Sequence, residues 1–240
     1  MFLKIVIVLL LLIVAASLLG GRGAGRAAVR PKSQIRPLML RIAIILLILG
    51  AGVIVVHLSG CSRSEDGFHA TDVTGANFGR LAALDGLTDP LGRRLASADF
   101  SGKAVVVFFG YTRCPDICPT TLSAMQAAMK LLGPDADRVQ VLFVTVDPER
   151  DTPDVLKDYV PWFDARFIGL HGDPAVIRDL AREFHVFFHK VEGETAMGYS
   201  IDHTATSYAY DPAGRLRLLI AHGAKPEHIA ADLRALLAGS

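Results

Sequence analysis

The chain has no strong excess of charge of either sign, and this absence excludes one class of partner. Its 240 residues carry 25 lysines and arginines against 24 acidic residues, which gives a net charge of +1. Proteins that bind nucleic acid usually present a strongly basic face, so this balance leaves no electrostatic footprint for DNA or RNA. The part of the chain after residue 77 also lacks internal repeats and low-complexity segments. We therefore expect one globular domain there and no nucleic-acid partner.

Cysteine is scarce, with three residues, but two of the three are close together. Cys114 and Cys118 follow the apolar run Ala104 to Phe109, which is short and rich in Val and Phe and therefore predicts a buried strand. A helical pattern begins at Thr120, and Pro119 suits a first helical position, so we expect Cys118 near the N-cap. Free N–H groups at a helix start stabilise a thiolate, which attacks disulfides and binds metal ions. A structural disulfide or two inert thiols is the alternative.

Long apolar runs are confined to the N-terminal part of the chain, at Ile5 to Leu19 and Ile42 to Leu58. Each approaches the roughly 20 residues that span a bilayer. If both are helices they form a hairpin, and the positive-inside rule keeps the segment between them in the cytoplasm. The chain after Leu58 then lies on the opposite side of the membrane. The segment between the runs has no acidic residue and six basic ones: Arg22, Arg26, Arg30, Lys32, Arg36 and Arg41.

A second interpretation starts the protein at Met39. The segment from Met39 through the apolar run to Leu58-Ser59-Gly60-Cys61 is similar to a bacterial lipoprotein signal peptide, which is cleaved before a cysteine that becomes lipidated. Cys61 is also the odd cysteine once Cys114 and Cys118 are paired. Both interpretations place the following domain on the outer face of a membrane, where disulfides can persist.

We expect three parts: a membrane segment over residues 1–60, a polar linker over 61–77 and a folded domain over 78–240. In the folded domain strand and helix patterns alternate, and Asp211-Pro212-Ala213-Gly214 is a turn between two late strands. A strand–helix–strand start and a hairpin-plus-helix end predict an α/β fold, a thioredoxin-like sandwich with a central mixed sheet. The expected strands are Ala104–Phe109, Val139–Val146, Phe167–Leu170, Val186–Val191, Thr204–Tyr210 and Leu216–Ala221, and the expected helices are Thr120–Leu132, Pro153–Phe163, Ala175–Phe184 and Pro226–Leu237.

The cysteine segment closely resembles the signature of the Sco/SenC proteins. Two further segments match in the same order, Asp147 to Pro153 and Asp202-His203-Thr204. The resemblance implies a membrane-anchored thioredoxin-like domain that binds copper through both cysteines and one histidine. It also implies that the protein assembles the CuA centre of cytochrome c oxidase subunit II, or keeps the cysteines of that subunit reduced. The cysteine segment reads Gly110-Tyr111-Thr112-Arg113-Cys114-Pro115-Asp116-Ile117-Cys118-Pro119.

His203 is the expected third copper ligand. Thiolates favour Cu(I), and a neutral imidazole can complete a three-coordinate site; Cu(II) is the other oxidation state to consider. Thioredoxin-like folds carry a proline at the position that His203 occupies, packed against the cysteine loop. A histidine there suits metal binding and has no use in a reductase. His185 and His189 flank a predicted strand and are more simply explained as core or rim residues.

Three further residues are candidates to support the ligands from outside. Asp147 ends a predicted strand at the sheet edge from which the cysteine loop emerges, although Asp147 and Asp151 could equally cap the following turn and helix. Tyr199 and Asp202 flank the histidine and could orient it. We expect Lys190 to Ile201 to be a mobile loop. Core positions are expected for Trp162, Phe187 and Phe188.

Two functions remain open. A copper metallochaperone would hold the metal with Cys114, Cys118 and His203 and pass it to subunit II by ligand exchange. A thiol–disulfide oxidoreductase would use Cys114 and Cys118 as a redox-active pair that forms a disulfide, one attacking a partner disulfide and the other resolving the mixed intermediate. The Pro-x-x-x-Thr-x-x-Cys arrangement of peroxide-reducing enzymes is missing before Cys114.

The expected setting follows from the same resemblance and from the apolar runs. We expect a bacterial inner-membrane protein whose folded domain faces the periplasm, and not an enzyme of the conventional kind. Subunit II is the expected partner, with other periplasmic copper chaperones or thiol reductases as further candidates.

Overall fold

The computed structural model describes residues 67–195 and 198–239. The expected membrane segment over 1–60, the alternative start at Met39 and the lipidation candidate Cys61 lie outside these residues. Within the described ranges, no helix combines the length and apolar character needed to cross a bilayer.

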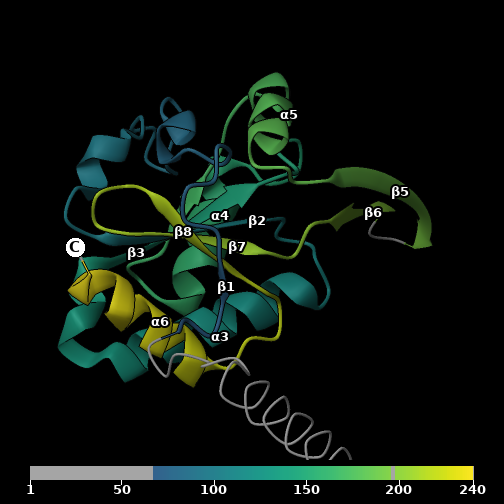
Figure 1. The fold of residues 1–240 in the computed structure, drawn as a ribbon. Helices are drawn as coiled ribbons and strands as arrows, with labels where there is room; N and C mark the ends of the chain where they lie inside the picture. Colours follow the sequence, from purple (N-terminus) through teal and green to yellow (C-terminus); the bar gives the residue numbers. More distant parts are fainter. Residues whose placement is uncertain (1–66, 196–197, 240) are drawn as a thin grey trace, which may run out of the picture. The chain divides into compact units, whose positions relative to one another are not determined.

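A mixed sheet of six strands forms the centre of the fold, in the order β1-β8-β7-β2-β3-β4 (Figure 1). β2 runs parallel to β3 and antiparallel to β7. Every residue of β2 and β3 is buried, as expected for strands that are covered on both faces. The predicted α/β sandwich with a central mixed sheet is confirmed. The strands are β1 (Thr71–Asp72), β2 (Ala104–Gly110), β3 (Val139–Thr145), β4 (Ile168–Leu170), β7 (Ser207–Tyr210) and β8 (Leu216–Ile220).

The helices cover both faces of this sheet. α3 (Ile117–Leu132) and α6 (Pro226–Ala238) pack against each other on one side, and α5 (Pro174–Glu183) lies on the other (Figure 1). α4 (Pro153–Phe163) has the predicted bounds, begins with Pro153 and is capped by the Thr152 hydroxyl, which accepts from the N–H of Val155. Short 3₁₀ helices connect these elements: η1 (Leu81–Leu84), η2 (Ser97–Phe100) and η3 (Gly133–Arg138).

A separate two-stranded sheet projects beyond the main one (Figure 1). It pairs β5 (Phe188–Thr195) with β6 (Gly198–His203) in antiparallel register. The expectation of a loop over Lys190 to Ile201 is therefore wrong, since both ends of that segment lie in strands. His203 is the last residue of β6 and not part of the following strand, which starts at Ser207.

Two other expectations are corrected. Trp162 is 81% exposed and Phe187 is 65% exposed, so neither is a core residue. The buried face of α4 consists of Leu156, Val160 and Phe163, and Trp162 falls outside this helical spacing. Part of the expected linker also joins the fold, because Thr71 and Asp72 pair with β8. The turn at Asp211 to Gly214 is present, with the N–H of Gly214 donating to the Asp211 carbonyl at 2.8 Å.

Candidate metal centre

The cysteine loop connects the end of β2 to the start of α3. The helix begins at Ile117, three residues earlier than predicted, so Cys118 lies inside the first turn and Asp116 is the N-cap residue. Cys118 is fully buried, whereas Cys114 is partly exposed, and both are free thiols. The N–H of Cys118 donates to Sγ of Cys114 at 3.4 Å. Cys114 therefore folds back over the helix start, and one of the free N–H groups of the helix stabilises its thiolate.

Gly110, the last residue of β2, makes room for the buried sulfur. A Cβ atom at this position would lie 2.7 Å from Sγ of Cys118 and 2.8 Å from the ring of Phe143. Neither approach is possible for real atoms, so a side chain here would displace the sulfur or the ring. The glycine thus allows strand β2 and helix α3 to hold Cys118 between them.

His203 reaches the cysteines from the end of β6. Its Nε2 atom lies 3.3 Å from Sγ of Cys118, and its Nδ1 atom lies 3.0 Å from the carbonyl oxygen of Thr204. A carbonyl can only accept, so Nδ1 carries the proton and donates it to Thr204. The lone pair of Nε2 is then directed at the sulfurs, which is the tautomer a metal ligand requires. The ring of Tyr111 contacts the imidazole edge-on, with centroids 5.8 Å apart.

The three side chains converge on one point. The ligand atoms of Cys114, Cys118 and His203 all lie within 4.8 Å of one another, and among the described residues this is the one group of three or more His, Cys, Asp or Glu side chains so arranged. Two soft thiolates and a neutral imidazole match the preferences of Cu(I). The residues present therefore fit the expected metal.

The two thiols differ in acidity because they share a hydrogen bond. Donation from the Cys118 thiol lowers the pKa of Cys114 far below its ordinary value, with further help from the backbone N–H groups of Cys118 and Asp116. The same hydrogen bond, together with burial, raises the pKa of Cys118. The first proton lost by the pair thus leaves a thiolate on Cys114, the more accessible sulfur.

Asp151 fastens the cysteine loop to β3. Its buried carboxylate accepts from the N–H of Thr112 at 3.0 Å, from the Thr112 hydroxyl at 2.6 Å and from the Thr145 hydroxyl at 2.6 Å. Burial raises the pKa of this carboxyl group. The capping role considered for Asp151 belongs to Thr152, and the bonds to Thr112 connect two matched segments that are far apart in the sequence.

The structure places the three supporting candidates differently. Asp147 is buried and accepts from the Tyr199 hydroxyl at 2.7 Å, so these two residues lie together. Asp202 is on the exposed face of β6, where its carboxylate lies 3.9 Å from Nε2 of His189. His185 stacks on the ring of Phe78, with centroids 4.7 Å apart. The thiols and His203 are thus brought together, while Asp147 and Tyr199 form a contact of their own.

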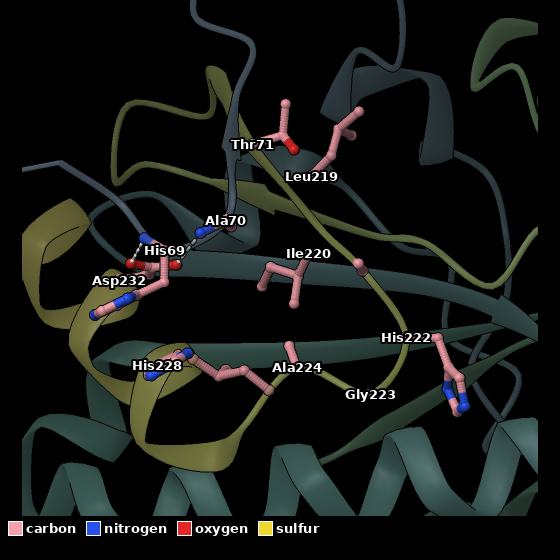
Figure 2. Close-up of a pocket in the computed structure, with 12 residues that line it drawn as sticks. His69, Ala70, Thr71, Leu219, Ile220, His222, Gly223, Ala224, His228 and Asp232 are labelled. Atoms are coloured by element: carbon pink, nitrogen blue, oxygen red, sulfur yellow. Dashed lines mark hydrogen bonds between the residues drawn. The ribbon is translucent and has the colours of Figure 1, made fainter. Parts of the chain in front are cut away.

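A second group of histidines lines a cavity of about 300 Å³ beside β1, β8 and α6 (Figure 2). The buried carboxylate of Asp232 accepts from the N–H groups of His69 and Ala70, at 2.7 and 2.8 Å. The rings of His69 and His228 stack in parallel with centroids 4.0 Å apart, so their in-plane lone pairs do not converge. These contacts fasten the start of β1 to α6, and we assign no metal to this cavity.

Comparisons with known proteins agree with this geometry. The chain matches the family model described as SCO1/SenC over residues 86–238. The SCO2-like protein of Rickettsia felis is 32% identical over 175 residues, which cover 72% of this chain and 85% of that protein. The structure of Bradyrhizobium japonicum ScoI with copper bound is 40% identical, with a TM-score of 0.59, and the match covers 66% of this chain and 98% of that one.

The solution structure of apo Sco1 from Thermus thermophilus is 38% identical, with a TM-score of 0.61, and the match covers 72% of this chain and 99% of that one. The family-model match extends over most of the folded domain, and its range includes the cysteine segment, the Asp147 segment and His203. The chain belongs to the SCO1/SenC family.

Proposed function

We propose that this protein is a membrane-tethered copper metallochaperone that assembles the CuA centre of cytochrome c oxidase subunit II. The observation that carries the proposal is the convergence of Cys114, Cys118 and the Nε2 atom of His203 at one edge of the sheet. Copper is the metal bound in the similar ScoI structure. The role in oxidase assembly is what the resemblance to Sco/SenC proteins implies.

The accessibility of each ligand suggests the order of transfer. Cys118 is fully buried, so a partner cannot reach its sulfur directly. Cys114 and His203 are each partly exposed, and they belong to different elements. A docked partner would replace these two ligands first, and Cys118 would release the metal last. Subunit II would receive it, and other periplasmic copper chaperones or thiol reductases would load or reduce the site.

A second candidate function is thiol–disulfide exchange with subunit II. The specific observation in its favour is the asymmetry of the pair: Cys114 is accessible and its pKa is lowered, whereas Cys118 is buried beside it. Cys114 would attack a partner disulfide, and Cys118 would resolve the mixed disulfide, leaving a Cys114–Cys118 disulfide. The two thiols lie close enough to share a hydrogen bond, which suits either function.

We further propose that residues 1–60 attach the domain to the bacterial inner membrane, either as two helices or through a lipid on Cys61, with residues 61–77 as a connecting segment that β1 joins to the fold. The basic residues between the apolar runs support a periplasmic domain.

Replacing His203 by Ala separates the two functions. Both thiols remain, so disulfide chemistry should be nearly unchanged, whereas copper loses one of three ligands. We expect copper affinity to fall by at least the roughly 10- to 100-fold that losing a mere supporting residue costs. Two quantities are measured: the copper affinity of the full chain, and the oxidase activity of cells that carry the variant.

The matched control is His189→Ala, because His189 lies on the same hairpin but on its exposed face. This variant should keep its copper affinity. Full oxidase activity in cells carrying His203→Ala, despite weakened copper binding, would contradict the metallochaperone and favour the oxidoreductase. Unchanged copper affinity in that variant would instead remove His203 from the ligand set.

A further inference from the structure

Arg150, in the loop between β3 and α4, is a cation that the fold has largely taken out of water. Its side chain is 12% exposed, and that of its ion-pair partner Asp147 is fully buried. Its Nε–H group donates to the Asp147 carboxylate, and its Nη1–H group donates to the carbonyl oxygen of Tyr199 at 2.7 Å. Tyr199 belongs to β6, so a charge-assisted bond connects the loop to the main chain of the hairpin that carries His203.

The side chain of Tyr199 adds a second connection between the same two segments. The guanidinium carbon of Arg150 lies 3.6 Å from the centre of the Tyr199 ring, and the Tyr199 hydroxyl donates to Asp147 at 2.7 Å. The ammonium group of Lys190, on β5, lies 4.5 Å from the same ring and pairs with Glu149 at 2.6 Å. Cation–π contacts gain strength when the cation is desolvated, as Arg150 is. The hairpin is thus fastened to the β3–α4 loop by main chain, ring and hydroxyl together.

The side chains of β6 alternate between its two faces, so the attachment at Tyr199 also restrains the metal ligand His203. Tyr199, Ile201 and His203 share the inner face of the strand, while Ser200 and Asp202 are exposed. Four residues of strand place His203 about 13 Å from the Tyr199 anchor, with buried Ile201 between them. A paired strand is stiff over this length, so the position of Tyr199 sets the position of the imidazole.

The same guanidinium also contacts the other half of the metal centre. Its carbon lies 5.8 Å from the centre of the Tyr111 ring, in the loop that carries Cys114. The Tyr111 hydroxyl accepts from the N–H of Ile201 at 3.2 Å, and the Tyr111 ring lies against His203. Arg150 therefore touches both the loop with the thiols and the strand with the imidazole.

We propose that Arg150 is a positioning residue that holds His203 against Cys114 and Cys118 by fastening the β5–β6 hairpin to the β3–α4 loop. The inference rests on the proposed copper site. Arg150 acts only through His203, so its effect on copper binding requires the imidazole. Lysine cannot replace it, because a lysine ammonium lacks the planar fork that bonds Asp147 and the Tyr199 carbonyl while stacking on a ring.

The test is a double-mutant cycle on the full-length reduced chain, with Cu(I) titrated against a chromophoric chelator. Arg150→Met should weaken copper binding by about 10- to 100-fold, the usual effect of losing a residue that supports a ligand. In a His203→Ala background the same change should cost no more than about twofold, because Arg150 acts only through the imidazole; two independent residues would instead give additive losses. Arg182→Met is the matched control, because Arg182 pairs with Asp179 on the exposed surface of α5; it should leave copper affinity unchanged in both backgrounds.

A metal-free readout tests the attachment itself. In the absence of copper, Arg150→Met should speed amide hydrogen exchange at Ile201 and Asp202 at least tenfold, while exchange in β2 and β3 is unchanged. Arg150→Lys should resemble Arg150→Met in both measurements. If Arg150→Met does not fold, as judged by circular dichroism, Tyr199→Phe takes its place in the cycle, because it removes the bond to Asp147 and keeps the ring.

An equal loss of copper affinity with and without His203, or unchanged exchange in β6, overturns the inference. Failure of the proposed function would give a different result. The unmodified chain would then bind no copper, while amide hydrogen exchange in β6 would still be faster in Arg150→Met.

Discussion

At the scale of single residues, the two cysteines are chemically unequal. Cys114 is partly exposed and receives hydrogen bonds from the Cys118 thiol and from backbone N–H groups, which lower its pKa. Cys118 donates to Cys114 and is buried, and both effects raise its pKa. The accessible sulfur is therefore the one that is ionised at neutral pH, as both an attacking thiolate and an exchangeable ligand require.

This inequality predicts how the reduced chain reacts with iodoacetamide at different pH values. Because the Cys114 thiolate is already formed in acid solution, its alkylation rate should change little between pH 6 and pH 8. A free thiol with a pKa of about 8.5 would react roughly tenfold faster for each pH unit in this range. Cys118 should remain unlabelled. Mass spectrometry of the labelled peptides at each pH gives both rates.

Cys118→Ala is the matched variant, since it removes the hydrogen bond that contributes most to the low pKa of Cys114. Its Cys114 should have a higher pKa and so react more slowly at pH 6. Preferential labelling of Cys118 in the unmodified chain would show that the acidities are assigned the wrong way round.

The identity of the ligands could be predicted from the sequence, but their burial and their supporting contacts could not. The spacing of Cys114 and Cys118 before a helix predicted a stabilised thiolate, and the resemblance to Sco/SenC proteins added His203. Which sulfur is buried depends on contacts across the fold. Arg150 was missed because its partner Tyr199 is far away in the sequence; its place in the matched segment Asp147 to Pro153 was the available signal.

At the scale of elements, the site depends on how closely strand β2 approaches helix α3. Gly110→Ala tests this approach, because the added Cβ would lie 2.7 Å from Sγ of Cys118. We expect the free energy of unfolding to fall by about 1 to 3 kcal/mol, as for other overpacked cores. Copper affinity should fall as well, since the sulfur must move. Urea denaturation and the copper titration described above measure the two effects.

Gly239→Ala is the control, because a Cβ there would meet its nearest atom, the Ala235 carbonyl oxygen, at an ordinary 3.4 Å. Its unfolding free energy should change by less than about 0.5 kcal/mol. Equal free energies of unfolding for the Gly110 and Gly239 variants would contradict this expectation, because the core beside Cys118 would then accommodate the added Cβ without loss of stability.

The β5–β6 hairpin was the element that the sequence pattern predicted least well. Buried strands such as β2 and β3 are continuous apolar runs and are easily recognised, but β5 and β6 form a two-stranded ribbon that is largely polar. The alternation of Tyr199, Ile201 and His203 with Ser200 and Asp202 was a usable signal. It also explains why Asp202 does not share the inner face with its neighbour His203: adjacent residues of a strand point to opposite faces.

At the scale of the whole molecule, the order of elements was the most reliable information in the sequence. Alternating strands and helices, followed by a hairpin and a helix, are compatible with few arrangements, and the observed sheet order is one of them. The start of the domain was harder to place. β1 has only two residues, and its attachment depends on Asp232, which lies at the other end of the chain.

The N-terminal 60 residues lead to a prediction about the membrane. Six basic residues between two apolar runs favour a cytoplasmic loop, which places the folded domain outside the cytoplasm. A reporter fused after Ser240 that is active only in the periplasm should therefore work, and a reporter active only in the cytoplasm should not.

Cys61→Ser distinguishes the two modes of attachment. With two membrane helices, Cys61→Ser should change neither the membrane attachment nor the length of the protein. For a lipoprotein starting at Met39, the same variant should carry no lipid and keep its uncleaved signal segment. The opposite reporter pattern would place the thiols in a reducing compartment, where a disulfide between Cys114 and Cys118 would not persist and delivery to an oxidase outside would be impossible.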